Sequence, residues 1–388
     1  MTITKLNSQA IVAREPVQLA TPNWSLEEVQ IGEPGDDEVL VELYAAGICH
    51  TDVLLSSVPP GAIGVQYPKV VGHEGAGVAR AVGKNVHSVE VGDPILLSFD
   101  SCSTCEQCEA SHPSYCDTFV PKNYFGQQES MKTGDERIWS HFFGQSSFAQ
   151  YSVASKSCVV NVKDLIQDLS ELKLFAPLGC GFQTGMGAIT NITQAGPDDI
   201  VMIAGLGAVG MGALMTAKIT KCKAIIVVDR IQSRLELAKE LGATHTIDTS
   251  AADFSTLDVA VRSLIPTGAS IAVDTTGIPA IIEQSIQSTK FRGKMVLIGA
   301  PPFDYKLSFN ATEHLNSVLA IQSGRSILGC IEGDCDPRVS IPQMIQWYRE
   351  GIFPIDRLVQ YFDAFEYPKA MASLKCGDFV KPVLVWKE

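Results

Sequence analysis

The sequence lacks the features of membrane and secreted proteins. No run of about 18 uninterrupted apolar residues is present, which argues against a transmembrane helix. The first residues, MTITKLNSQAIVAREP, contain no continuous apolar segment of the secretory type and include Glu15, so neither a signal peptide nor a transit peptide is expected. We therefore expect a cytoplasmic protein that does not bind membranes.

Positive charge is also scarce. The chain has 30 Lys and Arg against 43 Asp and Glu, a formal net charge of −13. This balance argues against nucleic acid or an anionic membrane surface as the main partner. No internal repeat, low-complexity tract or long linker interrupts an ordinary globular composition of 46% hydrophobic residues. A length of 388 residues predicts two domains.

The hydrophobic pattern changes along the chain. The first half contains short alternating segments between glycines and prolines, for example at 38–45 and 75–83, which are typical of half-buried strands. Beyond residue 200, strongly apolar runs alternate with helix-like stretches; the runs are 200–204, 224–228, 271–273 and 295–298, and one helix-like stretch is 233–241. Such a pattern indicates a doubly wound parallel α/β sheet covered on both faces.

The domain organisation follows from this change. We predict an α/β domain at residues 184–331, inserted into a mostly β domain that is formed by residues 1–183 and 332–388.

A glycine-rich motif follows the first apolar run. Residues 205–210 read GLGAVG and precede a helix-compatible stretch at 211–218. Gly205 permits a tight turn, Gly207 lets the backbone approach a pyrophosphate, and Gly210 lets helix and strand pack closely. The sequence therefore predicts a dinucleotide site.

The acidic residue of that site is predicted as well. Asp229 ends the next strand, about 20 residues beyond the glycines, where an acid bonds the ribose hydroxyls of NAD. Because Asp229 would repel a 2′-phosphate, we expect NAD rather than NADP, although the neighbouring Arg230 is the kind of residue that accommodates NADP. Arg234 is also assigned to the cofactor site.

Eleven cysteines are unusual for a chain expected in a reducing compartment, where a cysteine cluster indicates metal binding or catalysis. Four of them can wrap one tetrahedral Zn²⁺ from a single loop: Cys102, Cys105, Cys108 and Cys116. Because protein would fill all four positions, this zinc is predicted to be structural. Five cysteines belong to no motif; we expect Cys335 to be exposed and the others, Cys158, Cys222, Cys330 and Cys376, to be buried thiols.

Three further motifs carry a family resemblance: GICHTD at 47–52, VGHEG at 71–75 and LGCGFQTG at 178–185. Together with the four cysteines and GLGAVG, they make nearly the whole chain resemble the zinc-dependent medium-chain alcohol dehydrogenases. The segment FFGQSSF at 142–148 most resembles the aryl, or benzyl, alcohol dehydrogenase branch. The resemblance implies a Rossmann coenzyme domain, a GroES-like catalytic domain, and a homodimer or homotetramer in which residues 325–330 form the edge strand.

The resemblance also implies a second, catalytic zinc. Cys49, His73 and Cys180 would hold it and leave a fourth position open to water or substrate. Asp52 would orient the His73 ring, and Glu74 lies where it could approach the metal from behind.

Roles in proton transfer and coenzyme binding are implied in the same way. Thr51 would accept the substrate proton and pass it to the coenzyme ribose. Leu54 stands where many relatives have a histidine that carries the proton to solvent, so we expect slow or differently pH-dependent oxidation. His50 and Lys381 correspond to contacts with the coenzyme phosphates, and Thr184 to a contact on the nicotinamide side.

The substrate is the least determined feature. Phe99, Phe142 and Phe143 fall in segments that line the cleft in relatives, and aromatic walls favour an aromatic or allylic alcohol over ethanol. We therefore predict a zinc enzyme that interconverts a primary, aryl or bulky allylic alcohol and its aldehyde with NAD.

Three alternatives stay open. The first is a biosynthetic reductase of an aldehyde, a conjugated C=C bond or an iminium group. The second is a lyase that keeps zinc and cofactor without net redox change. The third is a binding or structural protein on the same fold.

Overall fold

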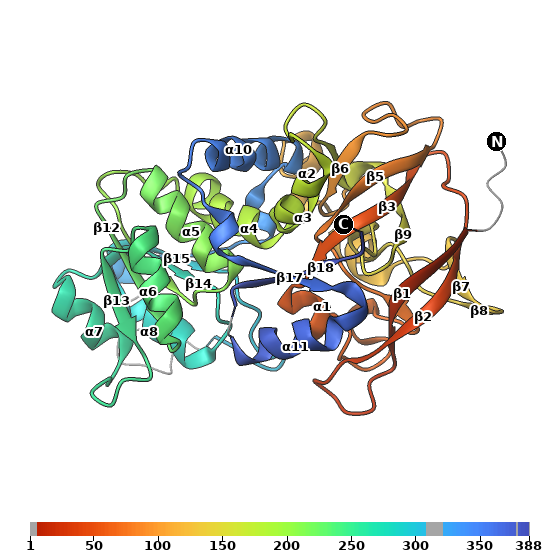
Figure 1. Ribbon diagram of the computed structural model, residues 1–388. Coiled ribbons are helices and arrows are strands. Elements are labelled where there is room, and N and C mark those ends of the chain that lie inside the picture. Colours follow the sequence, from red (N-terminus) through yellow and green to blue (C-terminus); the bar gives the residue numbers. More distant parts are fainter. Residues whose placement is uncertain (1–5, 308–320, 378, 388) are drawn as a thin grey trace. The chain divides into compact units, whose positions relative to one another are not determined.

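The computed structural model describes residues 6–307, 321–377 and 379–387 (Figure 1). The chain divides into two compact units, Met1–Cys180 with Asp336–Glu388, and Gly181–Cys335. These divisions lie a few residues from the predicted boundaries at 183/184 and 331/332. Residues 308–320, which belong to the predicted α/β domain, lie outside the described residues.

Two contacts explain why both ends of the inserted unit extend beyond the predicted limits. The Gln183 side-chain amide donates a hydrogen bond to Glu332 Oε2 over 3.0 Å. The Cys335 thiol lies 3.5 Å from the carbonyl oxygen of Gln183. The first helix of the unit, α4 (Gly181–Gly187), also packs closely against the next helix, α5 (Ala208–Ile219), so it belongs with the inserted unit.

The inserted unit is built on a six-stranded parallel sheet in the order β13-β12-β11-β14-β15-β16. Its strands are β11 (Ile200–Ala204), β12 (Ala224–Asp229), β13 (His245–Asp248), β14 (Ala269–Asp274), β15 (Thr289–Leu297) and β16 (Ser326–Gly329). This is the strand order of a Rossmann fold, which confirms the predicted doubly wound sheet. Further helices of this unit are α6 (Gln232–Leu241), α7 (Leu257–Leu264) and α8 (Pro279–Ser288) (Figure 1).

Both faces of this sheet are covered. Met202 and Ala204 on β11 belong to one apolar cluster with Leu257 of α7 and Ile282 of α8. Helix α5 packs against β11 and β12, and α6 packs against β12 and β13. A central strand that is buried on both faces needs apolar residues at successive positions, which is why IVMIA is continuous rather than alternating.

The other unit contains two mainly antiparallel sheets. One has the order β4-β1-β2-β7-β8. Its strands are β4 (Lys69–Val70), β1 (Leu6–Arg14), β2 (Asn23–Ile31), β7 (Met131–Thr133) and β8 (Glu136–Arg137). The other has the order β10-β6-β5-β3-β18-β17, and β9 also pairs with β3. Its strands are β10 (Val159–Asn161), β6 (Pro94–Leu97), β5 (Gly75–Val82), β3 (Glu38–Gly47), β18 (Lys381–Val385), β17 (Val359–Asp363) and β9 (Tyr151–Ser155). The mostly β character predicted for this unit is confirmed.

The described helices of this unit lie between or beside these strands. They are the short helices α1 (His50–Leu55), α2 (Glu106–Glu109) and α3 (Leu172–Phe175) and the longer α10 (Pro337–Arg349) and α11 (Tyr367–Cys376). Strand β3 lies inside its sheet, pairs with β5, β9 and β18, and ends directly before α1. The fold therefore brings the GICHTD motif to the end of a buried strand.

The cysteines outside the motifs correct two predictions, because Cys335 was expected to be exposed and Cys376 to be buried. Cys335 is buried, at 1% exposure, because it packs under α4, whereas Cys376 is exposed at the end of α11. Cys158 is buried, and Cys222 and Cys330 are partly buried. Loop-like composition around Cys335 did not reveal that the segment is held against another element.

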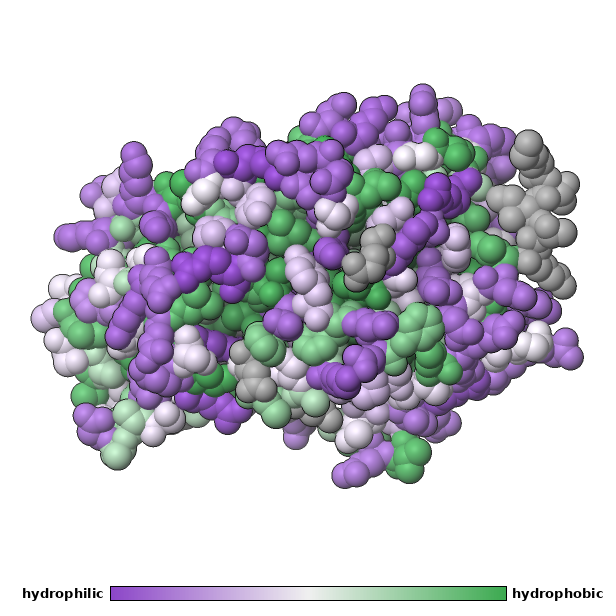
Figure 2. All heavy atoms as spheres, viewed as in Figure 1, coloured by the Kyte–Doolittle hydropathy of each residue, from purple (hydrophilic) through white to green (hydrophobic). Residues whose placement is uncertain are grey.

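The surface in Figure 2 is mainly hydrophilic, with hydrophobic side chains interspersed in small groups, in keeping with the strong net charge. Within the described residues, no helix combines the length and the apolar character that a membrane crossing requires.

Lys69 is an unusual member of the core. Its side chain is completely buried, its ammonium donates to the carbonyl oxygen of Tyr124, and it lies 5.0 Å from the centroid of the Phe142 ring. Tyr124 belongs to the short turn η3 (Pro121–Phe125). Burial lowers the pKa of Lys69 to about 7, because the charged form loses its hydration.

This burial makes the stability of the fold depend on pH. The pKa of lysine in an unfolded chain is about 10.4, so between about pH 7 and pH 10 the unfolded state binds more protons and Lys69 makes the free energy of unfolding rise with pH. We expect Lys69→Met to be more stable relative to the wild type at pH 6 than at pH 10, by up to about 4 kcal/mol. Urea unfolding at both pH values measures this difference.

The matched control is Lys239→Met, which changes an exposed lysine on α6. The control is expected to show no such difference between the two pH values. An equal pH dependence in both variants would show that Lys69 is not the titrating group.

Candidate functional site

Four potential metal ligands from three separate segments meet in the mostly β unit. Cys49 precedes α1, His73 and Glu74 lie between β4 and β5, and Cys180 follows the short turn η7 (Ala176–Gly179). Their ligand atoms all lie within 4.8 Å of one another, and all but Cys49 are buried. The structure thus brings together the residues that the family resemblance assigned to a catalytic zinc.

Asp52 holds this cluster from behind. Its Oδ1 accepts hydrogen bonds from His73 Nδ1 over 2.7 Å and from the Gly72 amide over 3.0 Å. Its Oδ2 accepts from the Cys49 amide over 2.9 Å. Because Asp52 is fully buried, these bonds fix both the ring of His73 and the backbone at Cys49.

The chemistry of the cluster fits a zinc ion. The bond to Asp52 occupies His73 Nδ1, and His73 Nε2 is buried without a hydrogen-bond partner in the described structure. The pKa of the Cys49 thiol is well below its usual value, because the Cys180 thiol donates a hydrogen bond to it and His73 contributes positive charge, although burial opposes the shift. A thiolate and an imidazole nitrogen are donors that Zn²⁺ prefers, and the ion would replace the proton on His73 Nε2.

Glu74 is tied to the end of the chain. Lys381 on β18 is almost completely buried, and its ammonium lies 2.8 Å from Glu74 Oε1 and 3.1 Å from the carbonyl oxygen of Ile48. Burial alone would lower the pKa of Lys381, but the charge of Glu74 raises it. The resemblance placed Lys381 at a coenzyme phosphate, whereas in this structure its ammonium pairs with a carboxylate beside His73.

Aromatic rings pack against the cluster. The Phe143 ring stacks on the His73 ring with centroids 4.4 Å apart, and Phe142 meets it edge-on at 5.6 Å. Phe99 lies one ring further away, 5.9 Å from Phe119, which in turn contacts Phe143. The predicted pocket residues therefore form one buried aromatic wall beside His73.

Thr51, in the segment GICHTD, lies next to the ligand Cys49. Its hydroxyl lies 3.7 Å from Cys49 Sγ, and its side chain is partly exposed. A hydroxyl in this position can exchange a proton with a group bound at the cluster.

The four-cysteine motif also forms a cluster. The Sγ atoms of Cys102 and Cys108 lie 3.9 Å apart, and those of Cys105 and Cys116 lie 4.0 Å apart. Zn–S bonds of about 2.3 Å in tetrahedral geometry place sulfur atoms about 3.8 Å apart. The spacing therefore fits a zinc ion with four protein ligands.

The ionisation of these thiols supports this fit. Hydrogen bonds from Thr104 lower the pKa of Cys102 to about 6, whereas burial and the neighbouring thiols Cys105 and Cys116 raise the pKa of Cys108 to about 12. Four thiols this close cannot all ionise unless a cation compensates the repulsion. A divalent ion supplies that charge.

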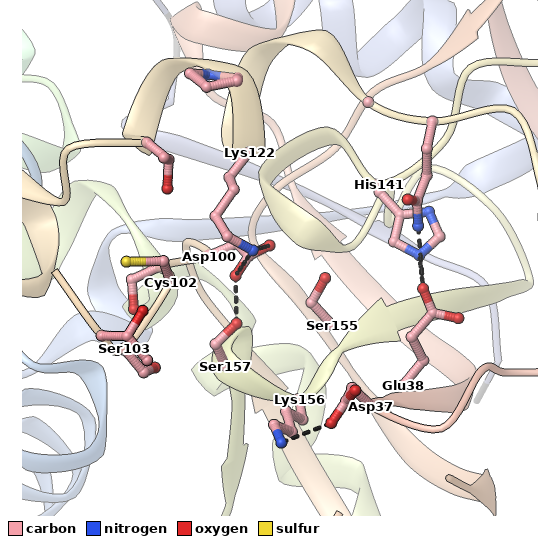
Figure 3. A pocket seen from close by; sticks show the side chains of 16 residues that line it. Asp37, Glu38, Asp100, Cys102, Ser103, Lys122, His141, Ser155, Lys156 and Ser157 are labelled. Atoms are coloured by element: carbon pink, nitrogen blue, oxygen red, sulfur yellow. Dashed lines mark hydrogen bonds and ion pairs between the residues drawn. The ribbon is translucent and has the colours of Figure 1, made fainter. Parts of the chain in front are cut away.

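A polar cavity of about 850 Å³ lies next to the four-cysteine cluster (Figure 3). Cys102 lines it, whereas Cys49, His73 and Cys180 do not. Its charged groups are already paired: Asp100 with Lys122 and Ser157, and Glu38 with His141 over 3.0 Å. The cavity is therefore separate from the proposed reaction site.

The glycine-rich motif has the geometry expected for binding a pyrophosphate. Gly205 has a φ of +91°, a conformation that favours glycine, and a Cβ on Gly210 would lie 1.9 Å from the carbonyl oxygen of Gly205. A Cβ on Gly207 would meet nothing within 4 Å, so the backbone there is open. Helix α5 begins at Ala208 without a side-chain cap, which leaves its first amides available to an anion.

Asp229 organises the neighbouring loop. Its carboxylate accepts hydrogen bonds from the Leu206 amide over 2.7 Å and from the amides of Arg230 and Ile231 over 2.7 and 3.0 Å. Arg234 lies nearby on α6, where burial lowers its pKa and the charge of Asp229 raises it. Asp229 thus joins the glycine loop to the turn after β12, at the position predicted for the ribose contact.

The other two cofactor predictions fall in different units. Thr184 is buried in α4 of the inserted unit. His50 is exposed at the start of α1 in the mostly β unit.

Sequence reasoning missed two buried polar residues beside the cluster. Gln145 donates hydrogen bonds to the carbonyl oxygens of His73 and Ser98, and Ser98 donates to that of Gly179. Gln145 lies within the segment FFGQSSF, from which only phenylalanines were predicted to line the substrate pocket. The separation of Gln145 and His73 in the sequence gives no indication that they are in contact.

Comparisons with known proteins agree with this geometry. Residues 35–164 match the family model of the alcohol dehydrogenase GroES-like domain, and residues 208–350 match that of the zinc-binding dehydrogenases. The chain is 36% identical to geraniol dehydrogenase of Castellaniella defragrans over 386 residues, which is 98% of each protein.

Solved structures that resemble nearly the whole chain include the following two. An alcohol dehydrogenase zinc-binding domain protein from Burkholderia ambifaria has 36% identity and a TM-score of 0.90, with 99% of this chain and 100% of that one covered. Benzyl alcohol dehydrogenase from Acinetobacter calcoaceticus has 34% identity and a TM-score of 0.87, with 98% and 99% covered. These matches confirm the predicted GroES-like and Rossmann architecture, and the chain belongs to the zinc-dependent medium-chain alcohol dehydrogenases.

Proposed function

We propose that the protein interconverts a primary aryl or allylic alcohol and its aldehyde, with NAD as the hydride carrier. The observation that carries this proposal is the packing of Phe142 and Phe143 on His73, which gives the three-ligand cluster an aromatic wall. The relatives named geraniol dehydrogenase and benzyl alcohol dehydrogenase support it, since their names specify an allylic and an aryl alcohol.

Residues of the mostly β unit have different roles at the reacting oxygen of the alcohol. When bound, the zinc ion supplies positive charge that favours loss of the alcohol proton, and the nicotinamide ring supplies the hydride acceptor. Cys49, His73 and Cys180 hold the ion, and Asp52 keeps the His73 ring in one orientation. The Phe143 ring orients a flat substrate and excludes water from one side of the site.

Thr51 takes the proton. Its hydroxyl lies 3.7 Å from Cys49 Sγ and would relay the alcohol proton during oxidation, accepting it while donating its own proton to a ribose hydroxyl of the coenzyme; aldehyde reduction uses the reverse transfer. This favours carbonyl chemistry over reduction of a C=C bond, which needs no proton exchange at an oxygen. Leu54 on α1 cannot carry the proton onward, so release to solvent uses another group or water.

The inserted unit holds the coenzyme. The loop Gly205–Gly210 and the first amides of α5 would bind the pyrophosphate, and Asp229 would bind the ribose hydroxyls and disfavour NADP. Thr184, Arg234, His50 and Lys381 are further proposed coenzyme contacts. We also propose a homodimer or homotetramer in the cytoplasm, as the resemblance and the composition indicate.

A substrate panel tests the aromatic wall. We expect Phe143→Leu to lower kcat/KM for benzyl alcohol and geraniol about tenfold, because the flat contact surface is lost, and to change that for ethanol by less than about threefold. Initial rates with all three alcohols measure the difference. Phe365→Leu, at an exposed ring, is the matched control and is expected to leave all three values unchanged. Equal losses for all three alcohols in Phe143→Leu would contradict the proposed substrate class.

Coenzyme preference tests Asp229. We expect the wild type to prefer NAD over NADP by more than about tenfold in kcat/KM, and Asp229→Ser to reduce this preference by a similar factor, since the charge that repels a 2′-phosphate is removed. Arg230→Gln is the control for the neighbouring cation and should weaken residual use of NADP. A wild type that prefers NADP would show the assignment of Asp229 to be wrong.

Metal content tests the two clusters separately. We propose two zinc ions per chain, one catalytic and one structural. Cys49→Ser is expected to lose one ion and all activity with little change in the thermal midpoint, whereas Cys105→Ser is expected to lose the other ion and several degrees of thermal stability. Atomic emission spectrometry and thermal unfolding measure both effects. A wild type with a single ion that only one substitution removes would refute the two-ion proposal.

A further inference from the structure

Gln145 connects segments that are far apart in the sequence. Its side chain is fully buried. The side-chain nitrogen donates to the carbonyl oxygens of His73 over 2.9 Å and of Ser98 over 2.7 Å, and the side-chain oxygen accepts from the Gly75 amide over 3.0 Å. One amide therefore contacts the backbone on both sides of Glu74 and at the end of β6.

Only one orientation of this amide satisfies the site. Two backbone carbonyls face its nitrogen and one backbone N–H faces its oxygen, so a flipped amide would place like groups against each other. Glycine at position 75 is required for the approach, because a Cβ there would lie 2.9 Å from Gln145 Oε1. The three bonds act as a fixed bridge.

Ser98 extends the bridge to the third ligand segment. Its hydroxyl donates to the carbonyl oxygen of Gly179 over 2.6 Å, and Gly179 directly precedes Cys180. A Cβ on Gly179 would lie 2.0 Å from the carbonyl oxygen of Leu97, so glycine lets η7 approach the end of β6 this closely. The backbone at His73 is thus linked through Gln145 and Ser98 to the backbone at Cys180.

The loop that carries Gln145 is held in an unusual conformation. His141, Phe143 and Ser146 have φ angles of 62°, 53° and 53°, a region that is costly for a bulky residue such as phenylalanine. Contacts at both ends hold it: His141 Nε2 pairs with Glu38, as Figure 3 shows, and the Ser146 hydroxyl donates to the Val70 carbonyl over 2.6 Å. Strained backbone persists where the surroundings determine it this closely.

We propose that Gln145 and Ser98 are positioning residues that set the spacing between His73 and Cys180, and thereby the geometry and retention of the metal at that cluster. The inference rests on the proposed zinc site. Neither residue supplies a ligand; both act through the backbone of the ligand segments. The donors of the amide are the decisive groups, since they contact both carbonyls.

Three substitutions test whether Gln145 and Ser98 act through their hydrogen bonds or only by filling space in the core. Gln145→Glu keeps the shape and the acceptor for Gly75 but replaces the two N–H donors by an oxygen. Gln145→Leu removes donors and acceptor at similar volume. Ser98→Ala removes the hydroxyl that donates to the Gly179 carbonyl and leaves Gln145 unchanged. We expect each to release one zinc ion to a chelator about 10- to 100-fold faster than the wild-type holoenzyme, with Gln145→Glu at least as fast as Gln145→Leu.

The matched control is Ser152→Ala. Ser152 is buried like Ser98, and its hydroxyl donates to the backbone oxygen of Gln145 rather than to the backbone of a ligand segment. It is expected to release zinc at the wild-type rate. A second measurement uses the full-length protein loaded with Co²⁺ alone, in which the visible bands report the ligand geometry; these bands should shift in the Gln145 variants and not in Ser152→Ala.

Each outcome decides the proposal. Wild-type zinc release and cobalt spectra in Gln145→Glu would overturn it, because space filling would then suffice. Equal effects in Ser152→Ala would also overturn it, because the loss would reflect the loop as a whole. Should the Gln145 variants fail to fold, unchanged release in Ser98→Ala would refute the link to Cys180. The proposed zinc site itself is tested with the single variant Cys49→Ser. If that variant holds and releases as much zinc as the wild type, the zinc site is refuted, and not only the role of Gln145.

Discussion

The buried carboxylate of Asp52 is the constraint on which the reaction site depends. A charge without solvent is costly unless hydrogen bonds surround it, and here the donors are His73 Nδ1 and the amides of Gly72 and Cys49. The carboxylate therefore stabilises the very backbone and ring orientation that the metal cluster needs. It also commits Nε2 of His73 to the side that faces Cys49 and Cys180, since Nδ1 is occupied.

The two clusters of potential metal ligands are built in opposite ways. The four cysteines between 102 and 116 come from one loop, so their geometry follows from local turns and short contacts. The other cluster joins three segments whose spacing is set by a surrounding network of Asp52, Gln145 and Ser98. A local cluster can form as soon as its loop does, whereas the second requires the assembled β unit. This difference fits the proposal of a structural ion at the first cluster and a catalytic ion at the second.

A feature could be predicted from the sequence when the residues that form it lie close together in the chain. The Rossmann sheet was predictable because continuous apolar strands, a helix and a glycine turn follow one another within about 30 residues. The ligands Cys49, His73 and Cys180 could be assigned only by family resemblance, because no spacing rule links residues so far apart. Two misjudged residues show the same limit: Cys335 was expected to be exposed but is buried, and Cys376 was expected to be buried but is exposed.

What the sequence by itself determined is the set of local structures: the four-cysteine loop, the glycine turn with Asp229, and the alternation of a β-rich and an α/β region. Each depends on residues within one or two elements, so periodicity and spacing are sufficient. The tertiary structure alone decided that Gln145 touches His73, that Lys381 pairs with Glu74, and that Phe143 stacks on the His73 ring. Those contacts join residues 70 to 300 positions apart, where only the packing of complete sheets determines which side chains meet.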